Sequence, residues 1–501
     1  MIPLQQLLKR LTTEPREIWG DDSIAINAIE FDSRKVGPGA LFAALRGAVV
    51  DGHDYIDQCV AEGATAILCE TRPKTAHPAA TFVVVEDSRA ALAEIAAAFY
   101  RSPSSKMRVA GVTGTNGKTT TTYLLKALCD HAFLRCGLIG TVQYELGDET
   151  IVASRTTPES TDLQRMLNRM LDNGCKAAVM EVSSHALIQH RSRGIEFDVV
   201  MFTNLSQDHL DYHRTMDDYF EAKCRLFDVA AEQRTKKPVA VINIDDGYGQ
   251  KLVKRIEKKM EVVTFGFGSR ADFRGRNLRA EVQGTHFSLD AEGRQYLVRV
   301  PLIGRFNVYN ALSALAAARA MGCSLRESVR TLADAPPVPG RMQPVPARRA
   351  FSAYVDYAHT PDALEKALET ARELNPRTLI CVFGCGGDRD KAKRSKMGAV
   401  AAKLADMAIV TSDNPRTEDP AAIIRDIEAG MKGRTYEVIE DRAKAIERAV
   451  ELAWSRDIIL IAGKGHEDYQ EIHGERLHFD DVQVTARAIE ARKPDHLNRP
   501  Q

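Results

Sequence analysis

The chain has 501 residues, of which 44% are hydrophobic and 27% are charged, so it is neither largely disordered nor fibrous. Lys and Arg together number 68, as do Asp and Glu, and this neutral balance does not favour a nucleic-acid binder or a polybasic membrane-surface protein. The nine scattered cysteines form no CxxC pair, which predicts reduced thiols. The start of the chain lacks signal-peptide features and no apolar run reaches membrane-spanning length, so we expect a cytoplasmic protein without membrane insertion.

Short apolar runs alternate with amphipathic helical stretches, which is typical of parallel α/β folds. Two breaks interrupt this alternation. The polar stretch 101–106 follows an Ala-rich helix, and 336–340 has three prolines in five residues, which cannot continue a helix or a central strand. The sequence therefore predicts an α/β protein of three domains, with bounds 1–102, 103–338 and 339–501.

Buried strands are expected throughout the second and third predicted domains. In chain order they are 108–112, 177–180, 198–202, 239–242, 378–383, 407–410 and 458–461. A stretch of period-two alternation over 285–300 predicts a hairpin that turns at Glu292-Gly293. Because ligands bind outside the carboxyl ends of parallel strands, we expect the chemistry in the turns that follow these runs.

A phosphate-binding loop follows the first of these strands. It reads Thr113-Gly-Thr-Asn-Gly-Lys-Thr-Thr120 and leads into a helical stretch. Its glycines let backbone N–H groups face a polyphosphate, Lys118 supplies a positive charge, and the Thr119 hydroxyl can reach Mg²⁺, so ATP is the expected ligand. The strict GxxxxGK[ST] spacing is not met, and a plain strand-to-helix turn with a surface lysine is the alternative.

Acids and histidines follow the next two strands. Glu181 comes directly after the run 177–180, where a nucleotide-binding domain places a metal-linked carboxylate, although a solvated glutamate is the alternative. His209 and His213 would share one face of a helix, which raises the possibility of zinc. Neither a zincin glutamate nor a third soft ligand accompanies them, so zinc remains the lesser possibility.

Taken together, these motifs resemble the Mur ligases, the ATP-dependent amide ligases that build the peptidoglycan stem peptide. The resemblance covers all three predicted domains and includes the variant glycine spacing of the phosphate loop. The matching segments are 113–119, 181–185, 203–209, 304–310, 340–341, 356–362 and 386–390. The resemblance implies an N-terminal α/β domain for a uridine nucleotide, a central P-loop-type ATPase domain with a mostly parallel sheet, and a C-terminal Rossmann-like domain.

Two further segments resemble the branch of the family that adds meso-diaminopimelate to UDP-N-acetylmuramoyl-L-alanyl-D-glutamate. These are Asp413-Asn-Pro-Arg416 and Gly463-Lys-Gly-His-Glu467. Diaminopimelate differs from lysine by a second carboxylate, which a planar guanidinium such as that of Arg416 can hold through two parallel hydrogen bonds. Ligases that add lysine lack this arginine in the motif.

Carried over by position, the resemblance implies three sets of binding residues. For ATP they are Gly114, Thr115, Asn116, Gly117, Lys118, Thr119, Thr120, Asn307, Arg341 and Asp356. For the UDP-linked dipeptide they are Ser33, Thr156, Thr157, Ser183, Gln189 and Arg191. For diaminopimelate they are Arg389, Asp413, Asn414, Pro415, Arg416, Gly463 and Glu467.

The resemblance also implies a metal site and a set of catalytic residues. Mg²⁺ would be held by Thr119, Glu181, His209 and Lys223. As an ammonium Lys223 would repel the ion, but the family carries a carbamylated lysine here, whose N-carboxylate supplies hard oxygen ligands. The expected catalytic residues are Lys118, Glu181, His209, Lys223 and His359, and the roles of His359 and His213 stay open.

Three rival functions remain. A lysine-adding ligase of the same type is opposed by Arg416, and a folylpolyglutamate synthase is opposed by the segment 413–416 and by the N-terminal nucleotide domain. A nucleotide-dependent regulatory switch would hydrolyse ATP slowly without an amino-acid requirement. The favoured function predicts a monomer whose partners are small molecules and not nucleic acid.

Overall fold

The computed structural model describes residues 1–47, 50–72, 77–132, 135–208, 212–233, 235–346, 349–433 and 435–492. The chain forms two compact units. The first comprises Met1–Arg274 with Leu312–Ser328, and the second comprises Gly275–Ala311 with Val329–Gln501. Within the described ranges, no helix is both long and apolar enough to cross a membrane. The three predicted domains and their bounds stay a prediction.

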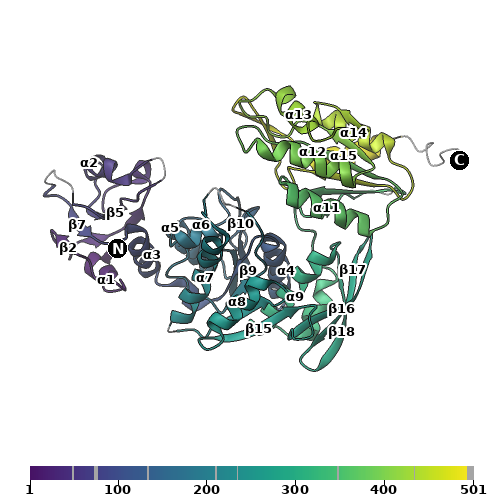
Figure 1. Ribbon diagram of the computed structural model, residues 1–501. Coiled ribbons are helices and arrows are strands. Elements are labelled where there is room, and N and C mark those ends of the chain that lie inside the picture. Colours follow the sequence, from purple (N-terminus) through teal and green to yellow (C-terminus); the bar gives the residue numbers. More distant parts are fainter. Residues whose placement is uncertain are drawn as a thin grey trace. The chain divides into compact units, whose positions relative to one another are not determined.

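The first unit begins with a small sheet in the order β2-β7-β6-β5-β4, drawn in purple in Figure 1. Alternate strand residues enter opposite cores, because successive side chains of a strand point to opposite faces. Leu41 and Leu68 pack with α1 and α3, whereas Phe42 and Ile67 pack with α2. The bounds are β1 Ile2–Pro3, α1 Leu4–Leu8, β2 Glu17–Trp19, β3 Ala25–Ile26, β4 Ala28–Glu30, β5 Ala40–Ala43, α2 Ile56–Ala61, β6 Ala66–Cys69, β7 Thr81–Val84 and α3 Ser88–Phe99.

The same unit continues into a larger sheet, in the order β11-β10-β9-β12-β8-β13-β14-β15. The six strands from β9 to β15 pair in parallel, and helices α5, α7 and α8 cover one face through a shared apolar core. The bounds are β8 Arg108–Thr113, α4 Lys118–His131, β9 Cys136–Ile139, β10 Gln143–Glu145, β11 Thr150–Val152, α5 Ser160–Asp172, β12 Ala177–Glu181, α6 Ser184–Ile188, β13 Val199–Phe202, α7 Met216–Glu232, β14 Val239–Asn243, α8 Gly247–Ile256 and β15 Glu261–Gly266.

Strand β8 lies between β12 and β13, which both follow it in the chain. Glu181 at the end of β12 pairs with Val112, and Phe202 at the end of β13 pairs with Thr113. The strand order therefore reverses at β8, the point at which open α/β sheets bind ligands. Three polar turns, those after Thr113, Glu181 and Phe202, meet at one edge of the sheet.

The second unit contains the hairpin that period-two alternation predicts. Strands β17 and β18 pair antiparallel, and Glu292 and Gly293 between them have φ angles of 52° and 71°. Two successive left-handed residues suit the twist of a two-residue hairpin turn, so the prediction is confirmed. The bounds are β16 Phe273–Glu281, which begins in the first unit, β17 Gly284–Ala291 and β18 Arg294–Val300; α9 Arg305–Ala320 and α10 Leu325–Leu332 have residues in both units.

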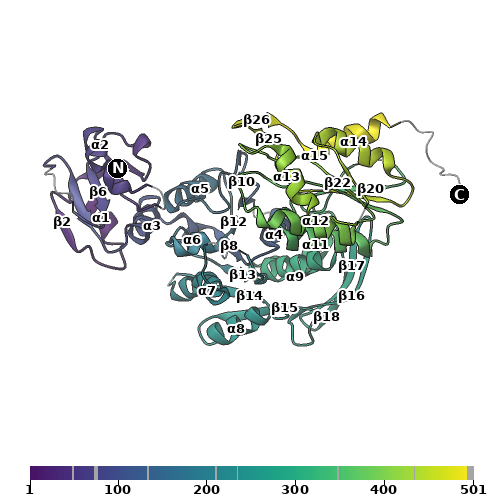
Figure 2. The ribbon, with the colours of Figure 1, turned by 45° about the horizontal axis from the view of Figure 1, so that its top comes forward.

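The rest of the second unit is a sheet in the order β19-β20-β24-β21-β22-β23, parallel from β20 to β23. Helices α11, α12 and α13 share one apolar core with the sheet, and α14 and α15 share the other. Figure 2 shows α11 beside α12, which pack on each other. The bounds are β19 Gln343–Pro344, β20 Ser352–Asp356, α11 Pro361–Glu373, β21 Leu379–Phe383, α12 Ala392–Leu404, β22 Met407–Val410, α13 Pro420–Glu428, β23 Tyr436–Val438, α14 Arg442–Leu452, β24 Ile458–Ala462, β25 Tyr469–Ile472, β26 Glu475–His478 and α15 Asp481–Ala491.

Candidate functional site

The phosphate loop joins the end of β8 to the start of α4, as predicted. Gly117 caps the helix with φ 85°, and Gly114 has φ 143°. A Cβ atom at Gly114 would lie 1.9 Å from the Thr203 hydroxyl, so no larger residue fits there. The loop is therefore pressed against the turn that follows β13, and Gly114 is required by both conformation and space, whereas Gly117 is required by its left-handed conformation.

Hydrogen bonds hold the loop against that turn. The N–H of Thr115 donates to the Asn204 carbonyl at 2.8 Å, and the N–H of Asn116 donates to Asn204 Oδ1 at 3.0 Å. The Thr203 hydroxyl donates in turn to the Asn116 carbonyl at 2.7 Å. Thr120 lies buried one residue beyond Thr119 in the first turn of α4. The loop shape is thus fixed by contacts from the turn that follows β13.

Two lysines converge on one carbonyl of this loop. Lys118 Nζ lies 3.0 Å from the Gly114 oxygen, and Lys223 Nζ, from α7, lies 2.8 Å from the same oxygen. Lys223 is 1% exposed and lies over the Tyr219 ring. Burial and the charge of Lys118 hold the pKa of Lys223 well below the usual range of a lysine. The predicted Lys223 therefore faces the phosphate loop.

Glu181 is a buried carboxylate held through both of its oxygens. The Thr119 hydroxyl donates to Oε1 at 3.0 Å, and the N–H of Thr141 donates to the same oxygen at 2.9 Å. The Thr141 hydroxyl donates to Oε2 at 3.1 Å. A threonine hydroxyl and a carboxylate are hard oxygen donors of the kind that Mg²⁺ prefers, so Thr119 and Glu181 fit the predicted metal. Sequence reasoning did not single out Thr141, which lies after β9.

Two of the three predicted histidines, His213 and His359, belong to the described residues and lie in different units. His209 lies outside the described residues. His213 is buried before α7 begins, so it is not on a helix, and its Nε2 is 2.9 Å from Ser184 Oγ. His359 belongs to the second unit, where Nδ1 is 2.9 Å from the Tyr357 carbonyl. Across the described residues, no three His, Cys, Asp or Glu side chains gather as a metal site would require.

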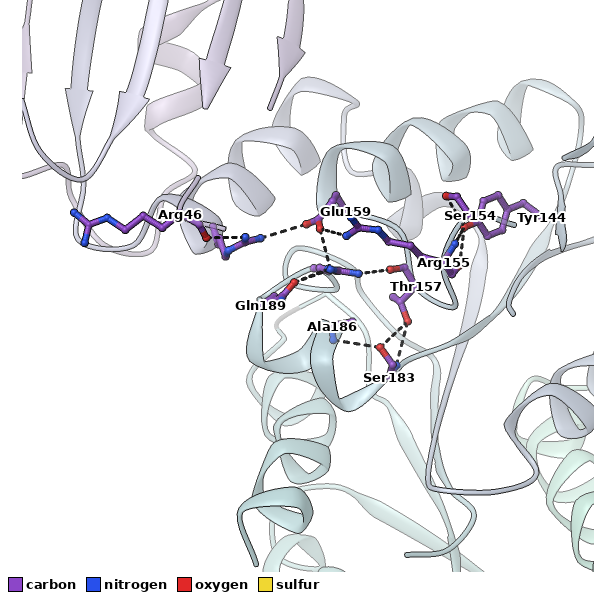
Figure 3. A network of polar contacts seen from close by, with 11 residues as sticks. Arg46, Tyr144, Ser154, Arg155, Thr157, Glu159, Ser183, Ala186 and Gln189 are labelled. Atoms are coloured by element: carbon purple, nitrogen blue, oxygen red, sulfur yellow. Dashed lines mark hydrogen bonds and ion pairs between the residues drawn. The ribbon is translucent and has the colours of Figure 1, made fainter. Parts of the chain in front are cut away.

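Five of the six residues predicted for the UDP-linked dipeptide form a hydrogen-bonded group beside Glu181, and Figure 3 shows Thr157, Ser183 and Gln189 of this group. The Thr157 hydroxyl donates to the Glu181 carbonyl at 2.9 Å and accepts from the N–H of Ser183 at 3.1 Å. Arg191 donates to the Thr157 carbonyl at 2.8 Å and to Gln189 Oε1 at 2.6 Å. The Thr156 and Thr141 hydroxyls are 3.1 Å apart, so they connect this group to the Glu181 carboxylate.

The sixth residue, Ser33, begins a short 3₁₀ helix after β4, in the small N-terminal sheet. Beside the main group lies a carboxylate that sequence reasoning missed, Glu159, which pairs with Arg155 and Arg191 of the same region and with Arg89 of α3. Glu159 directly follows Thr156-Thr-Pro158 in the sequence. This position indicates a functional role only when the surrounding arginines are known from the structure.

In the second unit, the residues predicted for the nucleotide lie near the ends of α9 and β20. Asp356 accepts from the backbone N–H groups of Met342 at 2.7 Å and Ala358 at 2.9 Å, and burial raises its pKa. The Arg341 guanidinium lies 5.0 Å from the Tyr357 ring centroid. Asn307 is fully buried and donates to the Ile303 carbonyl at 2.8 Å. Asp356 is thus positioned by backbone donors.

Most residues predicted for diaminopimelate meet at the carboxyl ends of β22 and β24. The Asn414 amide donates to Glu467 at 2.8 Å, and the fully buried Lys464 donates to Asn414 at 2.9 Å. Gly463 has φ 121°, and a Cβ there would lie 2.4 Å from an Asp413 carboxylate oxygen. Lys464, which was not predicted as a site residue, is therefore the cation around which this group is organised.

Arg416 lies at the edge of the same group in a left-handed conformation, with φ 54°. Its Nη1 donates to the Gly387 carbonyl at 2.7 Å, and its Nε is 3.6 Å from a Glu471 carboxylate oxygen. Pro415 is buried directly before it, and Arg389 is exposed after the turn of β21. The guanidinium is thus oriented by a backbone carbonyl and keeps further donors for a ligand.

Comparisons with known proteins agree with this arrangement. Three family models match, described as "Mur ligase family, catalytic domain" over 25–100, "Mur ligase middle domain" over 112–318 and "Mur ligase, glutamate ligase domain" over 340–465. The chain is 46% identical over 473 residues to the UDP-N-acetylmuramoyl-L-alanyl-D-glutamate--2,6-diaminopimelate ligase of Geobacillus kaustophilus (93% of this chain, 95% of the relative).

A relative of the same name in Clostridium acetobutylicum, numbered ligase 1, is 43% identical over 474 residues, which is 94% of this chain and 96% of the relative. A solved structure of an enzyme of that name is 36% identical, with a TM-score of 0.70 over 93% of this chain and 95% of the other. With these relatives and with its phosphate loop, buried glutamate and strand-end turns, the chain belongs to the Mur ligase family.

Proposed function

We propose that this protein is the ligase that joins meso-diaminopimelate to the side-chain carboxylate of D-glutamate in UDP-N-acetylmuramoyl-L-alanyl-D-glutamate, with hydrolysis of ATP to ADP and phosphate. The relatives that match nearly the whole chain carry this activity in their names. The single observation that carries the choice of amino acid is Arg416, oriented beside the Asp413, Asn414 and Glu467 group.

The first step is the activation of a carboxylate. An oxygen of the D-glutamate side chain attacks the γ-phosphorus of ATP, the bond to the β-phosphate oxygen breaks, and ADP leaves an acyl phosphate behind. Lys118 and the loop N–H groups neutralise charge on the transferred group, and catalysis is mostly positioning. Thr119 and Glu181 would hold Mg²⁺, which neutralises phosphate charge when it is bound.

Lys223 would serve this site as a carbamate. A lysine amine forms a carbamate with CO₂ only in its neutral form, and burial together with Lys118 lowers the pKa of Lys223 in that direction. The modified side chain would carry a carboxylate at the phosphate loop, because its nitrogen lies 2.8 Å from the loop oxygen of Gly114. His209 would complete the metal site.

The second step forms the amide bond. The amine of diaminopimelate attacks the acyl carbon, phosphate leaves, and the amine loses a proton. Arg416 would bind the distal carboxylate of diaminopimelate through paired hydrogen bonds. The residues Asp413, Asn414, Gly463 and Glu467, together with Arg389, would bind the rest of the amino acid; Asn307, Arg341 and Asp356 would bind the nucleotide. The role of His359 stays open.

The test is ADP release in the presence of the UDP-linked dipeptide and one amino acid at a time. We expect ADP with meso-diaminopimelate and a much lower rate with L-lysine. Equal rates would favour a lysine-adding ligase, ADP with a folate and glutamate would favour a folylpolyglutamate synthase, and ADP without any amino acid would favour a nucleotide switch. A cytoplasmic location and a monomeric state remain predictions.

A further inference from the structure

Glu159 lies at the centre of three arginines in the first unit (Figure 3). Its Oε1 accepts from Arg155 Nη1 at 2.6 Å and pairs with Arg191 Nη2 at 2.9 Å, and its Oε2 faces Arg89 Nη1 at 3.4 Å. The side chains of Glu159 and Arg191 are 11% and 10% exposed, and that of Arg89 is 22% exposed. These contacts define what we call the guanidinium cluster: Arg89, Arg155, Arg191 and Glu159.

The charges of the guanidinium cluster do not balance. Three guanidinium groups carry three positive charges at any physiological pH, and Glu159 supplies one negative charge. Burial lowers the pKa of Arg191, and the charges of Arg155 and Arg89 lower it further, although Glu159 raises it. Arg191 and Arg89 are mostly buried, whereas Arg155 is 54% exposed. Buried like charges are costly unless an anion compensates them, so the cluster favours a further anion.

The position of the cluster indicates which anion would bind. Arg191 also donates to the Thr157 carbonyl, within the group proposed for the UDP-linked dipeptide. Arg89 comes from α3 of the N-terminal sheet region, and its Nη2 donates to the Arg46 carbonyl at 3.0 Å. The cluster therefore connects the dipeptide group to the N-terminal sheet region, which also contains Ser33. A UDP-linked substrate that contacts both Ser33 and the dipeptide group must bind across the same two regions.

We propose that Arg89 and Arg155 bind an oxyanion of the UDP-linked substrate, and that Glu159 is a positioning residue that holds the three arginines apart and aimed before the substrate arrives. This inference rests on the proposed function. The oxyanion is either the diphosphate or a peptide carboxylate, since guanidinium groups pair with both. Glu159 then exchanges part of its ion pairing for the substrate.

A purely structural cross-link is the competing explanation, and the chain contains a matched example. Arg165 of α5 pairs with Glu30 of β4 at 3.2 Å and donates to Tyr100 at 3.1 Å. Arg165 joins the same two parts of the unit as Arg89 does. Its ion-pair partners are two acids, Glu30 and Asp162, so its charge is balanced. Arg165→Met therefore reports the cost of losing a cross-link without losing an anion site.

The experiment is a calorimetric titration of full-length wild type, Arg89→Met, Glu159→Gln and Arg165→Met with three probes: UDP, UDP-N-acetylmuramoyl-L-alanine and the complete UDP-linked dipeptide. Methionine preserves the apolar part of the arginine side chain while removing its charge. Thermal unfolding of each variant shows whether it folds. We expect Arg89→Met to weaken the dipeptide substrate's Kd about 10- to 100-fold, because a charge-assisted hydrogen bond is lost, and to reduce the salt dependence of binding. Glu159→Gln should weaken binding less, because the three arginines stay in place but lose the carboxylate that aims them.

The probes separate the two sources of the oxyanion. A loss already seen with UDP assigns Arg89 to the diphosphate, and a loss seen only with the complete dipeptide assigns it to a glutamate carboxylate. If Arg89→Met binds all three probes as wild type does, or only as weakly as Arg165→Met does, the proposal is wrong although the proposed function stands. If wild type binds none of the probes, both are overturned.

Discussion

The phosphate-loop site of the first unit and the strand-end turns of the second unit occupy equivalent places in two parallel sheets, but they are held differently. Glu181 is fixed by neutral donors, the hydroxyls of Thr119 and Thr141 and one backbone N–H. In the second unit, by contrast, the charged side chains of Lys464 and Glu467 meet at Asn414. The Glu181 carboxylate is thus held by strand register and neutral donors, whereas the second site is held by contacts between charged side chains and Asn414.

This difference has a consequence for mutations. A functional side chain in the first site can be removed while the strands and their hydrogen bonds remain. In the second site, a removed charge leaves buried partners unpaired, which destabilises the fold as well as impairing binding. A substitution in the phosphate loop should therefore lower activity without lowering stability, whereas a substitution of Lys464 should lower both.

The largest effect is expected for Lys118→Met. Loss of the charge that we propose to face the transferred phosphoryl group should lower kcat by about 10²- to 10³-fold, with the free energy of unfolding changed by less than about 0.5 kcal/mol. Steady-state kinetics and urea unfolding measure the two quantities. Lys126→Met is the matched control on the same helix, where the lysine pairs with Asp130, and it should leave kcat unchanged. A comparable loss in both variants would contradict a specific role.

Arg416→Lys is expected to raise the KM for diaminopimelate by about 10- to 100-fold, because a lysine cannot make the bidentate contact. The KM for ATP should not change. Arg476→Lys is the control, since Arg476 is 65% exposed and lies 3.9 Å from the same Glu471. An unaltered KM for diaminopimelate in Arg416→Lys would refute the assignment.

Lys464→Met should weaken both binding and stability. The Asn414 oxygen and Glu467 would lose a buried cation, which costs about 1–3 kcal/mol of unfolding free energy. Urea unfolding measures this cost, and Lys403→Met, at a 68% exposed position, should cost almost nothing. Lys464→Met with wild-type stability but reduced diaminopimelate binding would show that the two sites do not differ in the way described.

Thr141→Val tests the positioning of Glu181 without a change of charge. The backbone N–H contact remains and the hydroxyl contacts to Glu181 and Thr156 are lost, so we expect about a tenfold lower kcat/KM and a higher Mg²⁺ concentration for half-maximal ATP binding. Thr141→Ser should restore both values. If Thr141→Val and Thr141→Ser have the same kcat/KM and the same Mg²⁺ dependence, the hydroxyl has no positioning role.

The smallest effect concerns pH. Hydrogen bonds from Arg394 lower the pKa of Glu418 from about 4.5 to about 2. A lowered folded-state pKa stabilises the protein above the unfolded value, and this contribution is lost as the pH falls from 4.5 towards 2. Wild type should therefore be more stable than Glu418→Gln near pH 6, and the difference should shrink below pH 4. A difference that stays constant with pH would contradict this pairing.

Local patterns in the sequence predicted much of the fold. The strands Met407–Val410 and Val199–Phe202, and the hairpin turn at Glu292-Gly293, lie where alternation and apolar runs placed them. The phosphate loop was likewise predicted, because its glycines, lysine and threonine are adjacent in the chain.

What the sequence did not predict depends on strand order and on long-range pairing. Thr141 faces Glu181 only because β9 lies next to β12, and no periodicity specifies that neighbour. Glu159 becomes notable only when α3 brings Arg89 to it across 70 residues of chain. The bounds of the three domains and the roles of the individual site residues remain predictions for the same reason.

The most direct test of the central claim is phosphate release by the wild-type protein with ATP, Mg²⁺ and the UDP-linked dipeptide, started by addition of either meso-diaminopimelate or L-lysine. We predict release that requires all substrates and that is at least about tenfold faster with diaminopimelate, given the value of a paired guanidinium contact. Release at the same rate with lysine, or without any amino acid, would contradict the account.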